Sequence, residues 1–127
     1  MIAFVVPGKP QAKQRPRLAN GFAYTPKETV EYENWVKLCY RNANQPTLEG
    51  ELEAEITFGF PIPKSKLRQA QAGARPTTKP DLDNLAKAVL DSLNGLAYHD
   101  DSQIVELLVR KVYDAEPKVV VVIKERE

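Results

Sequence analysis

The sequence predicts an α/β or α+β fold, in which helices pack on one mixed β-sheet of about four strands within a single domain covering residues 1–127. The chain has 127 residues, a length typical of one domain. Hydrophobic residues make up 43% of it, enough for a core that needs no disulfide. Segments with strand and helix patterns follow one another in the order strand, helix, strand, helix, strand, strand.

The chain opens with a predicted strand and a basic, irregular segment. Ile2 to Val6 is a short β-branched run, and Pro7 and Gly8 end it. Residues 7–22 contain several prolines, which exclude a regular helix there.

A helix is predicted next. Thr25, Pro26 and Glu28 have the spacing of a helix N-terminus, with Thr25 as the N-cap and Pro26 at the first helical position. The helix is expected to continue to about Asn44. Its core face is expected to contain Val30, Trp35, Leu38 and Cys39.

The middle of the chain predicts a half-buried strand and a short helix. Glu51 to Phe60 alternates between apolar and polar residues, so one face is expected in the core and the other in water. The apolar face comprises Leu52, Ala54, Ile56 and Phe58. Lys64 to Ala72 is compatible with a short helix, which Gly73 and Pro76 would end.

The last third predicts an amphipathic helix and a hairpin. Asp81 to Asn94 has helical spacing of its apolar residues, and Asn94-Gly95 supplies a stop. These apolar residues are Leu82, Leu85, Ala86, Val89, Leu90 and Leu93. Ile104 to Tyr113 and Lys118 to Lys124 are β-branched runs separated by four residues, which predicts an antiparallel hairpin.

Basic residues are segregated along the chain, although 18 Lys and Arg nearly balance 17 Asp and Glu to give a formal net charge of +1. Residues 1–27 and 56–80 contain basic side chains and no carboxylate. Such segments suit a polyanion, while ordinary solvated loops are the alternative. The basic side chains that could contact a polyanion in this way are Lys9, Lys13, Arg15, Arg17, Arg68, Arg75 and Lys79.

Composition excludes several classes of protein. Cys39 is the one cysteine, so we expect neither an internal disulfide nor a Cys/His zinc site. We expect a reducing, cytoplasmic setting. We expect neither a signal peptide nor a membrane span. No Gly-rich phosphate loop, GxSxG or HExxH motif occurs, which argues against P-loop NTPases, α/β-hydrolases and zincins and against a nucleotide cofactor.

The residues that could carry chemistry begin at Asp81. Asp83, Lys87 and Asp91 are spaced by four and would lie along one side of the predicted helix, with Asp81 as its N-cap. The helix dipole favours ionised carboxylates at this end, as ligands of a hard cation must be. The alternative is that these residues only cap the helix and form an i,i+4 ladder of ion pairs.

Asp100 and Asp101 follow the helix after a short connection. If they meet the helix acids, two carboxylates about 4 Å apart repel by about 4 kcal/mol at an effective dielectric constant near 20. A divalent cation would relieve this repulsion, and Mg²⁺ takes further ligands from substrate phosphate, which suggests a metal-dependent phosphodiesterase. The neighbouring His99 is interpreted as a surface turn residue, and Cys39 as a core residue. Phe22 and Tyr24 could stack on exposed bases or belong to a hairpin core.

The sequence resembles the RusA family of Holliday junction resolvases, found in bacteria, phages and prophages. The N-terminal part of the resemblance lies in Pro7-Gly8-Lys9-Pro10, Arg15-Pro16-Arg17 and Tyr24-Thr25-Pro26. Its central part lies in Pro80-Asp81-Leu82-Asp83-Asn84, Lys87, Asp91-Ser92-Leu93-Asn94-Gly95 and Asp100-Asp101-Ser102-Gln103. Together these motifs span most of the chain, and their combination is specific.

The resemblance implies Mg²⁺-dependent cleavage of four-way DNA junctions by a homodimer in recombination and repair, with Mn²⁺ as a substitute metal. Asp81, Asp83 and Asp101 would be the catalytic metal ligands, and Lys87 would contact the reacting phosphate. The basic side chains named above would be the DNA-binding residues. Asp91 and Asp100 would act from a second shell, although the choice between Asp100 and Asp101 as the ligand stays open.

Three other readings remain open. The chain could be a structure-selective DNA-binding module without activity, a metal nuclease for another branched DNA, or a phage protein that binds a partner.

Overall fold

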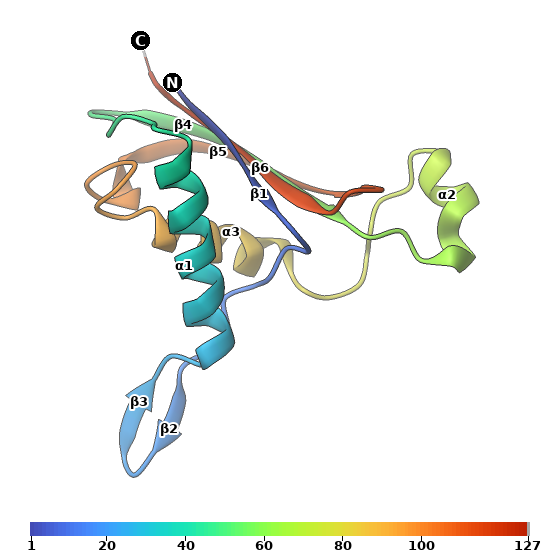
Figure 1. Ribbon diagram of the computed structural model, residues 1–127, viewed down its shortest axis with the longest axis horizontal. Coiled ribbons are helices and arrows are strands. Elements are labelled where there is room, and N and C mark those ends of the chain that lie inside the picture. Colours follow the sequence, from blue (N-terminus) through green and yellow to red (C-terminus); the bar gives the residue numbers. More distant parts are fainter. Residues whose placement is uncertain (127) are drawn as a thin grey trace.

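Four strands form one mixed sheet in the order β1 (Ile2–Pro7), β6 (Lys118–Glu125), β4 (Leu52–Phe60) and β5 (Ile104–Tyr113) in the computed structural model, which describes residues 1–126 (Figure 1). β6 is antiparallel to both of its neighbours, whereas β4 and β5 are parallel. The predicted fold class, a mixed sheet of about four strands with packed helices, is confirmed.

The strand β4 shows why the sheet has one buried face. Leu52, Ala54, Ile56 and Phe58 are buried as predicted, while Glu55 between them is exposed. This alternation follows from the two-residue period of a strand. The carboxylates of β4 therefore lie on the face of the sheet opposite the core.

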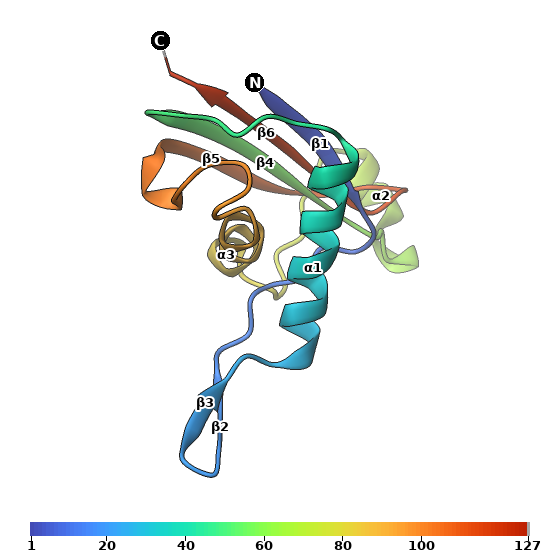
Figure 2. The same ribbon diagram turned by 60° about the vertical axis from the view of Figure 1, so that its left-hand side comes forward.

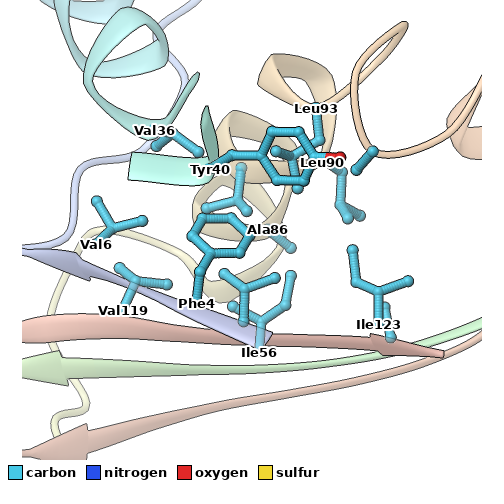
Figure 3. Packing of buried hydrophobic residues seen from close by; sticks show 14 of the residues in the cluster. Phe4, Val6, Val36, Tyr40, Ile56, Ala86, Leu90, Leu93, Val119 and Ile123 are labelled. Carbon is cyan, nitrogen blue, oxygen red and sulfur yellow. The ribbon is translucent and has the colours of Figure 1, made fainter. Parts of the chain in front are cut away.

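Helices α1 (Lys27–Asn42) and α3 (Leu82–Ser92) cover the other face of the sheet (Figure 2). Phe4 of β1 meets Tyr40 of α1 edge to face, with ring centroids 5.7 Å apart, inside the core between helices and sheet (Figure 3). The predicted apolar face of α3 is confirmed: its buried members include Leu85, Ala86, Val89 and Leu90, followed by Leu93.

The first turn of α1 differs from the prediction. The helix begins after Pro26, which occupies the N-cap position without a side-chain cap, so Thr25 is not the N-cap. Proline fixes φ near −65°, which preorganises the entry into the helix without a capping side chain.

The predicted core face of α1 is wrong for three of its four residues, while Cys39 is partly buried against the core. The buried residues are Thr29, Tyr32, Val36 and Tyr40, whereas Val30, Trp35 and Leu38 are 40–46% exposed. The indole N–H of Trp35 donates to the carbonyl of Pro7 (2.9 Å), a contact that suits an amphipathic ring at the edge of the core. The positions of β1 and α3 decide which face of α1 is covered, and local hydrophobicity does not.

The predicted β5–β6 hairpin is wrong, because β4 lies between the two strands. The connection from β5 to β6 crosses the end of β4 at Gly59. A Cβ at that position would lie 2.9 Å from Cβ of Asp114 and 3.2 Å from the carbonyl oxygen of Lys118. The absence of a side chain at Gly59 therefore lets a four-residue turn pass over the central strand.

Two smaller elements project from this core. β2 (Arg17–Ala19) and β3 (Phe22–Tyr24) form a hairpin at the N-terminal end of α1 (Figures 1 and 2). This hairpin begins within residues 7–22, the segment predicted to be irregular, and ends just after it. The predicted short helix is confirmed as a 3₁₀ turn, η1 (Lys64–Lys66), followed by α2 (Leu67–Gln71). None of the described helices is long and apolar enough to cross a membrane.

Candidate active site

A cavity of about 570 Å³ lies between α3 and β5. Its polar lining comes from Asp83, Lys87 and Asp91 of α3 and from Asp101 of a 3₁₀ turn, η2 (Asp101–Gln103). Its apolar lining consists of Leu82, Ala86, Leu90, Leu107 and Val109. The structure therefore brings the helix acids and the second acidic motif, which are distant in sequence, to one place.

The helical repeat explains how α3 contributes three polar groups to this cavity. Asp83, Lys87 and Asp91 follow one another by four residues and lie on one side of the helix, while Leu85 and Val89 are fully buried in the core. Asp81 occupies the N-cap position in an extended conformation (φ −71°, ψ 144°) without a side-chain cap hydrogen bond. Asp81 is exposed and does not line the cavity.

The two adjacent acids of the second motif have different surroundings. The carboxylate of Asp100 accepts a hydrogen bond from the Ser102 hydroxyl (2.5 Å), and Gln103 Oε1 accepts the backbone N–H of Asp100 (3.0 Å). The backbone N–H of Asp101 donates to Asn94 Oδ1 (2.8 Å), just after the end of α3, and Asp101 lines the cavity. Asp100 is thus engaged within its own turn, and Asp101 is the acid of this pair that lines the cavity.

These surroundings shift the pKa values of the two carboxyl groups in opposite directions. Burial raises the pKa of Asp101, and the negative charges of Asp100 and Asp91 raise it further. The Ser102 hydroxyl lowers the pKa of Asp100. The cavity therefore carries an excess of negative charge around Asp101, which a cation would relieve.

A buried tyrosine connects the acidic turn to α3. Tyr98 is 0% exposed and its hydroxyl donates to the carbonyl of Leu90 (2.6 Å). Burial raises the pKa of this phenol, and the charges of Asp101, Asp91 and Asp100 act in the same direction. Tyr98 therefore stays neutral and can hold the turn against the helix as a hydrogen-bond donor.

Residues 11–14, which we call the strap, cross α1 and α3. The ammonium of Lys13 lies 2.8 Å from Asp91 and 3.3 Å from Glu33, and its backbone N–H donates to the carbonyl of Asn84 (3.1 Å). Gln14 N–H donates to Thr29 Oγ1 (3.1 Å). The strap thus joins the N-terminal basic segment to the acid-bearing helix.

The electrostatics of Lys13 match this position. Burial lowers the pKa of Lys13, but its hydrogen bond to Asp91 and the charges of Glu33 and Asp91 outweigh burial and raise it. Sequence reasoning placed Lys13 among the DNA-binding residues, whereas the structure gives its ammonium two carboxylate partners within the chain.

Three lysines line a second cavity of about 200 Å³, which we call the lysine cleft: Lys9, Lys79 and Lys111. It brings together one member of each basic segment. Lys111 Nζ donates to the carbonyl of Thr78 (2.7 Å) and lies 5.8 Å from the centroid of the Phe60 ring. No acidic residue lines this cleft.

Lys111 was missed by sequence reasoning because it lies inside a predicted strand. A signal was present, since Lys111 follows Leu107 and Val109 at the two-residue period of the core-facing side of β5 and is paired with the buried Phe58. A charged residue at such a position calls for a partner or a function. The other predicted DNA-binding residues, Arg15, Arg17, Arg68 and Arg75, are exposed and line neither cavity.

The metal ligands predicted from the resemblance are not brought together as a set. Among residues 1–126, no group of three or more His, Cys, Asp or Glu side chains is arranged to hold a metal ion. Asp83 and Asp101 nevertheless line one cavity with surplus negative charge and offer only oxygen donors. This fits Mg²⁺, which keeps several waters and binds through one or two carboxylates plus substrate phosphate.

Two candidates considered weaker from the sequence lie away from the cavity lining. His99 Nε2 is 3.1 Å from Glu49 Oε1, and both side chains are about two-thirds exposed, at 71% and 67%. Cys39 is half-buried on α1, and burial raises the pKa of its thiol, so the thiolate is disfavoured.

Comparison with known proteins identifies the family. The sequence model described as Endodeoxyribonuclease RusA matches residues 7–124, which include the strap, the lysine cleft and every residue of the acidic cavity. The chain belongs to the RusA family of endodeoxyribonucleases. The resemblance found from the sequence motifs is thereby confirmed, and membership places the chain among nucleases that act on DNA.

Two relatives of the RusA-family chain differ in what is known of them. It is 40% identical over 136 aligned residues to the uncharacterised protein YqaN of Bacillus subtilis (strain 168), covering 98% of this chain and 96% of that protein. It is 41% identical over 75 residues to the crossover junction endodeoxyribonuclease rusA of Lactococcus phage r1t, covering 58% of this chain and 54% of the phage protein.

Proposed function

We propose that this chain is a Mg²⁺-dependent endonuclease that resolves four-way DNA junctions by paired, symmetric phosphodiester hydrolysis. The observation that carries the proposal is the single cavity in which Asp83, Lys87, Asp91 and Asp101 converge in a chain of the RusA family. The name of the phage relative, a crossover junction endodeoxyribonuclease, supports the junction as the substrate.

Asp83 and Asp101 are the proposed ligands of Mg²⁺ or its substitute Mn²⁺, and Asp81, from the start of the same helix, is the proposed third. A bound divalent cation supplies charge neutralisation at the scissile phosphate and lowers the pKa of an attacking water. Lys87 is placed on the same side of α3 as Asp83 and would contact a phosphate oxygen. Asp91 is held by Lys13 and therefore acts as a positioning residue for the acidic helix.

The basic residues would bind DNA mainly through its phosphates. The lysine cleft includes Lys79, two residues before Asp81, so it supports a phosphate contact close to the acids. Arg15, Arg17, Arg68 and Arg75 are exposed on projecting segments and would extend the contact along the DNA arms. Such binding is independent of base sequence and reads the shape of the junction.

A homodimer is part of the proposal, because two matched cuts require two copies of the site that Asp83, Lys87, Asp91 and Asp101 line, and each chain supplies one copy of these residues. Figure 2 shows one face of the sheet that neither α1 nor α3 covers. This face supports a contact with another surface, since Val5 is 45% exposed and Leu108 is 53% exposed. Sedimentation velocity with and without junction DNA measures the assembly. A monomer in both samples would contradict the homodimer.

The experiment that tests the activity compares Asp83→Asn, Asp101→Asn and Asp100→Asn on four-way, flap and linear DNA labelled on each strand. We expect the first two variants to lose junction cleavage by about 10²-fold or more while retaining binding. Asp100→Asn should retain most activity because its carboxylate is engaged within its own turn. Glu116→Gln, which removes an exposed charge elsewhere, is the matched control.

Each outcome separates the alternatives. If Asp83→Asn cleaves junctions in Mg²⁺ at the rate of the wild type, the catalytic assignment is refuted. Junction binding without any Mg²⁺-stimulated cleavage by the wild type would indicate a structure-selective DNA-binding module. Cleavage of flaps or linear duplexes in preference to junctions would indicate a nuclease for another DNA structure.

A further inference from the structure

The β2–β3 hairpin projects from the body of the protein, beyond the N-terminal end of α1 (Figures 1 and 2). Every residue of both strands is exposed. Asn20 (φ 52°) and Gly21 (φ 79°) form the turn, with the left-handed conformations that a two-residue type I′ hairpin requires. The sequence therefore builds a defined hairpin, which we call the finger, whose two strands are exposed along their whole length. Arg17 donates to Gln14 Oε1 of the strap (3.5 Å).

The register of this hairpin sorts its side chains onto two faces. The cross-strand pairs are Arg17 with Tyr24, Leu18 with Ala23, and Ala19 with Phe22. Paired residues share a face, and successive pairs alternate between faces. One face consists of Arg17, Ala19, Phe22 and Tyr24, which we call the aromatic face, and the other consists of Leu18 and Ala23.

The aromatic face combines exposed rings with a positive charge. Phe22 is 77% exposed and Tyr24 is 46% exposed, while Arg17 stands beside Tyr24. Residues 1–27 include no carboxylate, so the chemistry of the finger suits a polyanion. Aromatic rings stack on bases that have lost a neighbour, and adjacent cations hold the phosphates of the same strand.

An intact duplex offers no such base, because each base is stacked between its neighbours, whereas stacking is interrupted where strands exchange. We propose that the aromatic face binds DNA at the branch point, with Phe22 stacked on an exposed base and Arg17 on an adjacent phosphate. This inference rests on the proposed function, and it names the part of the chain that recognises the branch.

The strap limits how far the finger lies from the acidic helix. The backbone N–H of Lys13 donates to the carbonyl of Asn84 (3.1 Å). Asn84 is the residue that follows Asp83 in α3. Six residues from Lys13 to Ala19 span at most about 21 Å, and the step across to Phe22 adds about 5.5 Å. Phe22 therefore lies within about 27 Å of Lys13, or about eight base steps of 3.4 Å, and Lys13 itself is bonded to the first turn of α3.

The test uses junctions that contain 2-aminopurine at the branch, in EDTA to prevent cleavage, with a linear duplex as reference. Wild-type protein should change the fluorescence at the branch, and Phe22→Ala should abolish that change and weaken junction binding by about 5- to 150-fold. Leu18→Ala is the matched control, since Leu18 is 78% exposed on the opposite face of the same hairpin. It should behave as the wild type, and none of the proteins should change the signal on the linear duplex.

Equal behaviour of Phe22→Ala and Leu18→Ala would overturn the inference, as would an equal loss of affinity for junction and duplex. It would also be overturned if Phe22→Ala abolished self-association in the absence of DNA, because the face would then bind a second copy. Cleavage by the wild type in Mg²⁺, measured on the same junctions, separates the two proposals. Cleavage without a Phe22-dependent signal removes this inference alone, and the signal without cleavage removes the proposed activity alone.

Discussion

Replacing Lys13 with alanine should destabilise the protein without removing a DNA contact. The Lys13 ammonium lies 2.8 Å from Asp91 and 3.3 Å from Glu33, and the three side chains are only 25%, 24% and 17% exposed. The substitution would leave two partly buried carboxylates without their shared cation. The sequence alone predicted the opposite, a lysine available to phosphate.

The size of the effect follows from this partial burial. An exposed ion pair contributes about 0–1 kcal/mol, whereas removing one partner of a fully buried pair costs about 3–5 kcal/mol. The intermediate exposure of the Lys13 cluster places the expected loss in the free energy of unfolding at about 2 kcal/mol. For a chain of this length, that corresponds to a decrease in Tm of about 8 °C.

Thermal unfolding of the wild type, Lys13→Ala, Asp91→Asn and the double variant measures this loss and its origin. The double-variant cycle should give a coupling free energy of about 1 kcal/mol or more between Lys13 and Asp91. The raised pKa of Lys13 adds a pH dependence, because a cation stabilised by folding contributes fully below its ordinary pKa. The difference in Tm should therefore be constant at neutral pH and shrink as the pH rises through and above 10.5.

DNA binding supplies the refuting measurement. The slope of log affinity against log salt should be the same for Lys13→Ala and the wild type, whereas Arg17→Ala should reduce its magnitude by about 0.9, the contribution of one phosphate contact. An unchanged Tm together with a reduced slope for Lys13→Ala would show that Lys13 contacts phosphate. The strap would then not be held by the ion pairs described above.

Asp101→Asn should raise the Tm in the absence of divalent cations by about 2–4 °C, since it removes a carboxylate whose charged form is disfavoured by burial and by Asp100 and Asp91; a lower Tm in EDTA would contradict this reading of the cavity. Gly59→Ala should destabilise the protein by about 1–3 kcal/mol in urea unfolding, because its Cβ would lie 2.9 Å from Cβ of Asp114. A variant as stable as the wild type would mean that the turn over β4 has room to move.

Local patterns predicted the elements that carry strong periodicity. Helix α3 and strand β4 have apolar residues at regular spacing, and the acidic residues of α3 could be placed on one side of the helix from sequence alone. The same reasoning failed for α1, where Trp35 and Leu38 are more apolar than Thr29, which is buried. Which face of that helix is covered depends on β1 and α3, and this information is not local.

Pairings between distant segments were the other limit. The sequence predicts the strands β5 and β6, but the short turn between them suggests a hairpin, whereas β4 lies between them in the sheet. The glycine inside β4, Gly59, is the local feature that agrees with the turn crossing that strand. Likewise, the two acidic motifs were recognised, yet the engagement of Asp100 in its own turn and of Lys13 with Asp91 depends on three-dimensional contacts. Sequence reasoning therefore found most members of the acidic cavity and could not assign their partners.

The position of β6 has a consequence for how the chain acquires its structure. β6 is the last strand in the sequence but lies inside the sheet, where it separates β1 from β4. During synthesis, the backbone of β1 therefore cannot form its hydrogen bonds with β6 until residues 118–125 have left the ribosome. Contacts of such long sequence separation slow folding, so the sheet should close only after translation of β6, and the acidic cavity beside β5 should mature late.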